Sequence, residues 1–207
     1  MRVCVYGASS DEIDVLYKNE IYKLGKMMAE NKLDLVYGGG AQGLMGAVAR
    51  GVQENGGDVL GVSPEFFKVD GVLFEKCSNI IYTKTMRERK QIMEEEADAF
   101  IMTPGGCGTF EEFFEILTLK QLQRHNKAIV IYNVNNYYDV LLEMLDRSVT
   151  EKFTRGATKL LYYVTDSPSD AIDYIVNYVP VEISIKQLRN VEKDPFIYDQ
   201  IKNKKQI

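Results

Sequence analysis

Short apolar runs alternate along the chain with longer segments in which apolar residues recur every three or four positions. The short runs have the length and composition of strands, and the longer segments are typical of amphipathic helices. The first long segment shows the helical period in Val15, Leu16, Ile21, Leu24, Met27 and Met28. The pattern predicts strands at residues 3–6, 33–37, 58–62, 79–83, 97–103, 128–132 and 160–164, and helices near residues 12–30, 44–55, 85–95, 109–124, 137–149 and 167–178.

The repeated order of strand and then helix predicts an α/β fold, with a parallel sheet covered by helices on both faces. These segments fill residues 1–180 as a single domain, with no internal repeat or linker. Beyond Pro180 the pattern weakens, so residues 181–207 are predicted to be a C-terminal appendage, packed or frayed. Ligands of such folds bind beyond the carboxyl ends of the strands, where the loops gather.

Composition places the chain among ordinary soluble globular proteins. Its 207 residues are 45% apolar and 27% charged, which is enough for a substantial core. The net charge of −5 and the pI of about 5.1 argue against a protein that coats nucleic acid polymers, because such proteins need a basic face. A local pocket can still bind a single nucleotide.

The chain carries no sign of a membrane, disulfide or metal function. We expect a cytoplasmic protein without a membrane partner, since no signal peptide precedes the first strand and no apolar run approaches the roughly 20 residues of a membrane span. Cys4, Cys77 and Cys107 fit no even disulfide scheme and contain no CxxC pair. His125 is the only histidine, so neither a histidine-based zinc site nor a Ser-His-Asp triad is expected.

The most informative segment is residues 104–112, Pro-Gly-Gly-Cys-Gly-Thr-Phe-Glu-Glu, which joins a predicted strand to a predicted helix. Such a turn directs bare backbone N–H groups and the positive end of a helix dipole to one point, where a phosphate can bind. Gly105, Gly106 and Gly108 keep side-chain bulk away from the ligand, and Thr109 adds a hydroxyl. Glu112 adds a carboxylate one turn into the helix, which suggests chemistry on a nucleotide.

A structural explanation of the same residues stays open. Thr109 and Glu112 fit the capping box Thr-x-x-Glu, in which Glu112 would bond back to the N-cap backbone, and Thr85 with Glu88 forms a second such box. Cys107 lies at a helix N-terminus, where a thiol can become reactive, but no histidine base is nearby in the sequence.

A second glycine cluster follows the second predicted strand. Gly38, Gly40 and Gly43 match G-x-G-x-x-G, the dinucleotide-binding fingerprint, which normally follows the first strand with an acidic residue about 20 positions on. Asp58 has that spacing, but it begins a strand. The alternative is that these glycines only allow tight packing between strand and helix, and neither interpretation implies NAD.

The predicted helix at 85–95 begins with a mixed apolar and cationic face. Met86, Arg89, Lys90 and Met93 are three or four positions apart and share one side of the helix. This face suits a flat base and an anionic substrate. The alternative is a solvated charged helix with its methionines in the core.

Taken together, these segments resemble the Lonely Guy (LOG) family of cytokinin-activating phosphoribohydrolases, long mislabelled as lysine decarboxylases. The family's Pro-Gly-Gly-x-Gly-Thr-x-x-Glu stands at residues 104–112, and its Gly-Gly-Gly-x-x-Gly-Leu-Met-Gly at residues 38–46. Glu-Arg-Lys stands at residues 88–90, and the small-residue turn Gly-Ala-Ser-Ser at residues 7–10. Lesser echoes are Gly-Val-Ser-Pro at 61–64 and Asn-Tyr-Tyr at 136–138. The resemblance runs from residue 1 to about 178.

The resemblance implies a Rossmann-like fold, usually a homodimer, which hydrolyses the N-glycosidic bond of AMP or of a cytokinin ribotide without metal or cofactor. The family's catalytic pair corresponds to Arg89 and Glu112. The implied substrate- and phosphate-binding residues are Ser9, Gly39, Gly40, Met86, Lys90, Gly105, Gly106, Gly108 and Thr109. Asp98 is a weak candidate for the acid that protonates the leaving base.

Other functions remain open at this point. One alternative is a non-catalytic nucleotide-binding or carrier protein of the same Rossmann-like group. Another is a nucleosidase of general purine nucleotide turnover, without a hormone role. A lysine decarboxylase would require a pyridoxal phosphate lysine; Lys90 is the only lysine near the expected site, and nothing supports that role.

Overall fold

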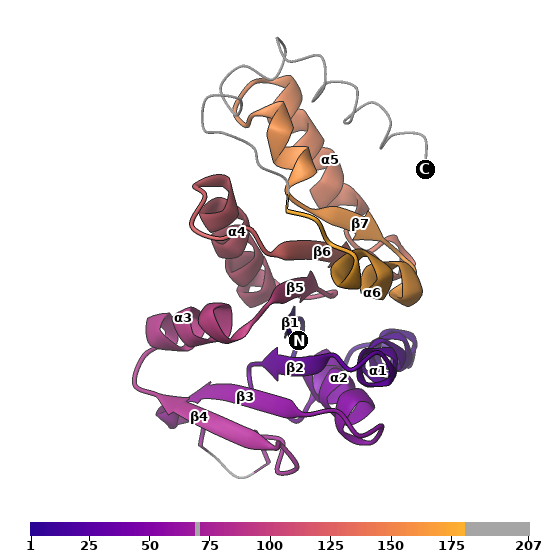
Figure 1. Cartoon of the computed structure of the whole chain (residues 1–207), viewed down its shortest axis with the longest axis vertical. Helices are drawn as coiled ribbons and strands as arrows, with labels where there is room; N and C mark the ends of the chain where they lie inside the picture. The colour runs from indigo at the N-terminus through magenta and orange to yellow at the C-terminus, as the bar shows by residue number, and fades with distance from the viewer. Residues whose placement is uncertain (69–70, 181–207) are drawn as a thin grey trace.

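The computed structural model describes residues 1–68 and 71–180 (Figure 1). The predicted appendage at 181–207 lies outside the described residues. The strands are β1 (Arg2–Tyr6), β2 (Asp34–Tyr37), β3 (Val59–Pro64), β4 (Asn79–Thr83), β5 (Ala99–Met102), β6 (Ala128–Tyr132) and β7 (Tyr163–Thr165). The α-helices are α1 (Val15–Glu30), α2 (Gly43–Gln53), α3 (Met86–Glu96), α4 (Cys107–Gln121), α5 (Asp139–Thr150) and α6 (Pro168–Val176), and short 3₁₀ turns occur at Glu65–Phe67, Val134–Asn136 and Gly156–Leu160.

The strands form one parallel sheet in the order β4-β3-β2-β1-β5-β6-β7. The chain builds outward from β1 to β4, then crosses back to place β5 on the other side of β1. Val3 is paired with Ala99 and Tyr6 with Met102, so β1 and β5 end level with each other. This reversal creates the crevice in which ligands of doubly wound sheets bind. The expected α/β architecture with a parallel sheet is confirmed.

Each face of the sheet carries its own apolar core. Side chains alternate along a strand, so Val3 and Val5 of β1 face one core while Cys4 and Tyr6 face the other. Helices α1, α2 and α6 cover the first core, and α3, α4 and α5 pack on the second (Figure 1). Burial on both faces explains why the strands are continuous apolar runs without polar alternation.

Two glycines bring α1 and α2 into close contact. A Cβ on Gly51 would lie 2.2 Å from the carbonyl oxygen of Tyr22, and a Cβ on Gly25 would lie 2.4 Å from that of Val48. Both distances are shorter than any real contact, so the two backbones approach only because neither residue has a side chain.

The expected strand at 160–164 is displaced in the structure. Its apolar residues lie in a 3₁₀ turn, Gly156–Leu160, and in the following residues Leu161 and Tyr162, while the strand itself is Tyr163–Thr165. Leu160, Leu161 and Tyr162 are buried against the second core. Burial alone therefore explains their apolar character, and a short apolar run does not distinguish a strand from a buried turn.

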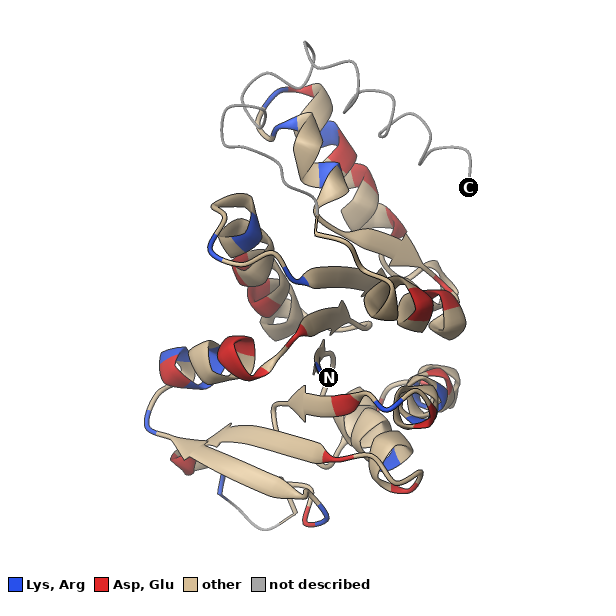
Figure 2. Ribbon diagram, viewed as in Figure 1, with Lys and Arg blue, Asp and Glu red and all other residues tan. Residues whose placement is uncertain are grey.

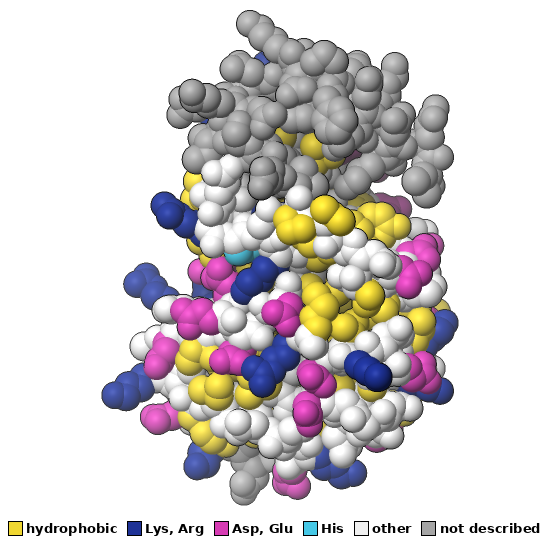
Figure 3. Space-filling view, in the orientation of Figure 1, with side chains coloured by type: hydrophobic (Ala, Val, Ile, Leu, Met, Phe, Trp, Pro, Cys, Tyr) yellow, Lys and Arg dark blue, Asp and Glu magenta, His cyan; other side chains and the backbone are white. Residues whose placement is uncertain are grey.

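Charged side chains lie mainly on the helices and loops (Figure 2). The face seen in Figure 3 has acidic and basic side chains interspersed, without a large patch of either sign. Within residues 1–68 and 71–180, no helix has the length and apolar character that a membrane crossing demands.

We expect Gly51→Ala to lower the free energy of unfolding by about 1–3 kcal/mol, because the added methyl group forces α1 and α2 apart. Urea denaturation of the purified variant measures this loss. Lys23→Ala, on the exposed side of α1, is the matched control and should unfold close to the wild-type midpoint. A Gly51→Ala variant as stable as the wild type would contradict the close approach of the two helices.

Candidate active site

A cleft of about 490 Å³ opens where β1, β2, β3 and β5 end. Its polar side is formed by Ser9, Gln42, Arg89, Thr109 and Glu112 with the backbone of Gly7, Gly38, Gly40, Gly106 and Gly108. Its apolar side is formed by Met45, Phe67, Val72, Leu73, Met86 and Met93. The cleft thus has the composition of a small-molecule site, apolar with a few converging polar groups.

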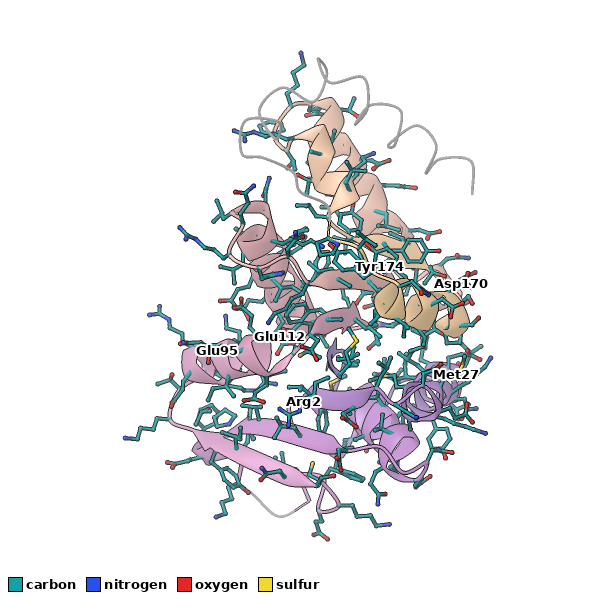
Figure 4. All side chains as sticks on the ribbon, viewed as in Figure 1. Arg2, Met27, Glu95, Glu112, Asp170 and Tyr174 are labelled. Carbon is teal, nitrogen blue, oxygen red and sulfur yellow. The ribbon has the colours of Figure 1, made fainter. Side chains whose placement is uncertain are left out.

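The centre of the cleft is an ion pair between Arg89 of α3 and Glu112 of α4. Nη1 of Arg89 lies 2.8 Å from Oε1 of Glu112, and the two side chains are only 11% and 13% exposed. Figure 4 labels Glu112 where α4 approaches α3. A buried carboxylate needs a partner of this kind, because leaving it unpaired is costly.

The strands fix the arginine from the other side. Nε of Arg89 donates to the carbonyl oxygen of Val62, near the end of β3, at 3.0 Å. A Cβ on Gly38, just after β2, would lie 2.1 Å from Nη2 of Arg89. The first glycine of the 38–46 cluster therefore makes room for the guanidinium.

Glu112 titrates in an unusual environment. Burial raises its pKa above the ordinary 4.5, and the charge and hydrogen bond of Arg89 offset this only in part. A carboxylate with a raised pKa in a cleft is a common property of catalytic groups. The adjacent guanidinium of Arg89 favours the ionised form of this carboxylate.

The N-terminus of α4 opens into the cleft. The helix begins at Cys107 with Gly106 as N-cap, and no side chain caps it. Within residues 1–68 and 71–180, no acceptor is found for the N–H groups of Cys107, Gly108 and Thr109. These N–H groups and the helix dipole favour an anion at this point.

The capping-box alternative for Thr109 and Glu112 is wrong. The helix begins two residues before Thr109, so Thr109 is within the first turn and Glu112 is bonded to Arg89 instead of the backbone. The second box is confirmed in modified form: the Thr85 hydroxyl accepts from the N–H of Glu88 at 3.1 Å, while Glu88 accepts from the N–H of Lys84.

The N-terminus of α2, by contrast, is closed. The side chain of Asp11 accepts a hydrogen bond from the N–H of Gly43 at 2.8 Å. The carbonyl oxygen of Ala8 accepts hydrogen bonds from the N–H groups of Leu44 and Met45. Gly43 has φ +58, and a Cβ there would meet the backbone of residues 8–10. The dinucleotide-like spacing therefore serves packing, and its helix has no N–H left for a pyrophosphate.

Eight of the eleven residues named for the site line the cleft: Ser9, Gly40, Met86, Arg89, Gly106, Gly108, Thr109 and Glu112. Gly39 lies behind it, with φ +81. Gly105 is packed against Thr109, since a Cβ there would lie 2.1 Å from Oγ1 of Thr109.

Lys90 points away from the cleft. Its ammonium group binds Glu111 and Glu115 of α4. Partial burial lowers the pKa of Lys90, but the two carboxylates outweigh this effect, and the pKa is raised. Among the cleft-lining residues that the structure describes there is no lysine. The single amphipathic face expected at 86–93 is thus divided: Met86, Arg89 and Met93 face the cleft, and Lys90 joins α3 to α4.

Asp98 is at the opposite edge of the sheet. Its carboxylate accepts from the backbone N–H of Arg2 at 2.8 Å, beside the amino ends of β1 and β5. It is therefore excluded as the acid that protonates a leaving base. Sequence reasoning also missed Phe67, Val72 and Leu73. Val72 and Leu73 reach the cleft because residues 72–74 bond to the backbone of Gly39 and Ala41, and Phe67 comes from the 3₁₀ turn after β3.

The remaining reactive side chains take no part in the cleft. Burial lowers the pKa of His125 to about 4, and its Nε2–H donates to the carbonyl oxygen of Ile116 at 2.8 Å. Cys107 is an exposed free thiol at the start of α4. Across residues 1–68 and 71–180, no three His, Cys, Asp or Glu side chains are grouped as metal ligands.

Solved structures share this fold at low sequence identity. The molybdenum cofactor binding protein of Rippkaea orientalis superimposes with a TM-score of 0.66 at 19% identity, over 84% of this chain and 94% of that one. The molybdenum cofactor carrier protein of Chlamydomonas reinhardtii gives 0.64 at 20% identity, over 84% and 95%. These similarities establish the Rossmann-like fold alone.

Sequence similarity is more specific. The family model described as "Possible lysine decarboxylase" matches residues 45–175. "Cytokinin riboside 5'-monophosphate phosphoribohydrolase LOG2" of Arabidopsis thaliana is 36% identical over 179 residues, 86% of this chain and 84% of that protein. "Probable cytokinin riboside 5'-monophosphate phosphoribohydrolase LOGL5" of Oryza sativa subsp. japonica is 38% identical, over 86% and 73%. With its family motifs assembled around one cleft, this chain belongs to the Lonely Guy (LOG) family.

Proposed function

We propose that the protein hydrolyses the N-glycosidic bond of adenosine 5'-monophosphates and releases the free base and ribose 5-phosphate. One observation carries this proposal: the uncapped N-terminus of α4 and a buried carboxylate share the same cleft, and Glu112 follows the N–H groups of residues 107–109 by three to five positions. A turn spans about 5.4 Å, so a ribose whose 5'-phosphate is bound at Gly106–Thr109 would lie beside Glu112.

The reaction follows from the positions of these groups. The N–H groups at the start of α4 and the Thr109 hydroxyl bind the phosphate and so fix the ribose. As the bond to the base breaks, positive charge develops on the sugar ring, as in glycoside hydrolysis. The Glu112 carboxylate stabilises this charge or activates the attacking water, and Arg89 keeps Glu112 ionised and correctly oriented.

The apolar side of the cleft suits a purine base. Phe67, Val72, Leu73, Met86 and Met93 offer flat and flexible surfaces in the same cleft as the polar groups. The related plant proteins are named for cytokinin riboside 5'-monophosphates, which supports an N6-substituted adenine as substrate. General purine nucleotide turnover is the second candidate, since unsubstituted AMP presents the same phosphate, ribose and purine.

A non-catalytic carrier is the main alternative from another class. It would need the phosphate-binding turn, but it would have no use for a carboxylate with a raised pKa beside the ribose. We also propose a homodimer, which the family resemblance supports, and light scattering on the purified protein measures that state directly.

Glu112→Gln should reduce the rate of base release by about 10³-fold while AMP binding persists, because the amide is isosteric but carries no charge. The assay is chromatography of AMP and isopentenyladenosine 5'-monophosphate after incubation with each protein. The ratio of the two wild-type rates separates cytokinin activation from purine turnover. Saturable AMP binding without any free base from the wild type would favour the carrier.

The pH dependence of kcat/KM should report Glu112, because kcat/KM reflects the ionisation of the free enzyme. Because burial raises its pKa, activity should fall on the acid side with a midpoint above 4.5, as the carboxylate takes up a proton. Steady-state rates between pH 4 and pH 8, at AMP concentrations well below KM, measure how kcat/KM falls on the acid side. An acid midpoint at or below 4.5 would exclude the buried carboxylate as the essential ionised group.

Arg89→Met should lower the free energy of unfolding at pH 7 by about 3 kcal/mol, because it leaves a buried carboxylate without its partner. Without the arginine the folded-state pKa of Glu112 rises further. The loss of unfolding free energy in Arg89→Met is therefore complete above the folded-state pKa of Glu112 in this variant. It disappears as the pH falls to about 4.5, by which point Glu112 is protonated in the folded variant.

The double variant Arg89→Met/Glu112→Gln is the control and should recover most of the stability but no activity. Urea denaturation at pH 7 and pH 4.5 compares all forms. Equal stability of Arg89→Met and wild type at both pH values would mean that the pair contributes nothing to the fold.

A further inference from the structure

The loop that precedes α4 is restrained by three hydrogen bonds to three consecutive carbonyl groups. The carbonyl of Thr103 accepts from the Tyr138 hydroxyl at 2.5 Å, and that of Pro104 accepts from the N–H of Ala8 at 3.1 Å. The carbonyl of Gly105 accepts from the Tyr137 hydroxyl at 2.9 Å. Two tyrosines from the turn before α5 therefore hold the loop at both ends of this stretch.

The Tyr137 bond has a direct consequence for the cleft. In a trans peptide the C=O and the following N–H point in opposite directions. Fixing the Gly105 carbonyl toward Tyr137 therefore directs the N–H of Gly106 to the other side, and Gly106 lines the cleft. Because glycines flank this peptide on both sides, little else opposes its rotation.

The turn that carries the tyrosines is built for this geometry. Asn135 and Asn136 both have positive φ, 53° and 57°, which non-glycine residues adopt rarely. The side chain of Asn133 accepts from the N–H of Tyr138 at 2.7 Å and so closes the turn. The Tyr137 ring packs against Tyr138, with centroids 4.9 Å apart, and against Tyr17 at 6.1 Å.

The two tyrosines differ in what they contribute. Tyr138 is 1% exposed and part of the second core, so its removal would disturb the fold. Burial raises the pKa of Tyr138, and the N–H of Gly105 beside its hydroxyl counteracts this in part. Tyr137 is 44% exposed, and among residues 1–68 and 71–180 the hydrogen bond of its hydroxyl is the one to Gly105 of the loop, so its role can be tested separately.

We propose that Tyr137 is a positioning residue for the substrate phosphate: its hydroxyl fixes the 105–106 peptide so that the Gly106 N–H points at the anion. This inference rests on the proposed function, since the anion is the 5'-phosphate of the nucleotide. Tyr137 itself touches no reacting atom. Its effect is therefore on substrate binding, and the bond-breaking step at Glu112 is independent of it.

The test is Tyr137→Phe, which keeps both ring contacts and removes only the hydroxyl. KM for AMP should rise about tenfold, kcat should stay within about twofold, and the dissociation constant of ribose 5-phosphate should rise by the same factor as KM. The melting temperature should stay near that of the wild type. Tyr22→Phe is the matched control, because it removes a tyrosine hydroxyl that bonds Glu54 at the end of α2, outside the cleft lining, and should change none of these values.

The outcomes separate this inference from the proposed function. Base release by the wild type with an unchanged KM in Tyr137→Phe would overturn the positioning role and leave the activity intact. A wild type that releases no base would refute the activity. Calorimetric titration would still decide the positioning role, because it compares the dissociation constants of ribose 5-phosphate for Tyr137→Phe and the wild type. A fall in kcat without weaker ribose 5-phosphate binding, or no ribose 5-phosphate binding by the wild type, would also overturn it.

Discussion

The buried ion pair between Arg89 and Glu112 is the constraint on which the site depends. Ionising a carboxylate that is this buried is costly without a cation beside it, and a fixed cation needs acceptors and space of its own. The carbonyl of Val62 supplies the acceptor and the missing side chain of Gly38 supplies the space. One electrostatic requirement thus joins the ends of two strands to two helices, and it explains residues that are distant from one another in the sequence.

The two glycine clusters show why similar sequences can have different functions. Both follow a strand and precede a helix, and both contain the glycine spacing of a phosphate-binding turn. At α2 the first N–H groups are already bonded to Asp11 and Ala8, whereas at α4 the corresponding groups have no acceptor from the described chain. The partners of the backbone N–H groups, and not the number of glycines, therefore determine which helix can bind an anion.

Local pattern was sufficient for the fold class and for the position of the glycine-rich turn that opens into the cleft. The parallel sheet and the approximate positions of its strands and helices follow from the alternation of short apolar runs and amphipathic segments, whereas the strand order came from the structure. What the sequence left open depended on contacts between distant segments. The choice between a cap and an ion pair for Glu112 needed the position of Arg89, 23 residues earlier. Lys90 shares a helix face with Arg89, but the carboxylates of Glu111 and Glu115 draw it away from the cleft, and no local rule predicts that partner.

The crossover that places β5 beside β1 also has a consequence for folding of the nascent chain. Tyr6 and Thr103 are hydrogen-bonded although they are 97 positions apart, so β1 has only β2 beside it until almost half of the chain has been synthesised. During that interval the apolar edge of β1 is an open template for another strand. Contacts of such long sequence separation also form slowly. The pairing that completes the cleft therefore forms late, and until then the edge of β1 is open to misassociation.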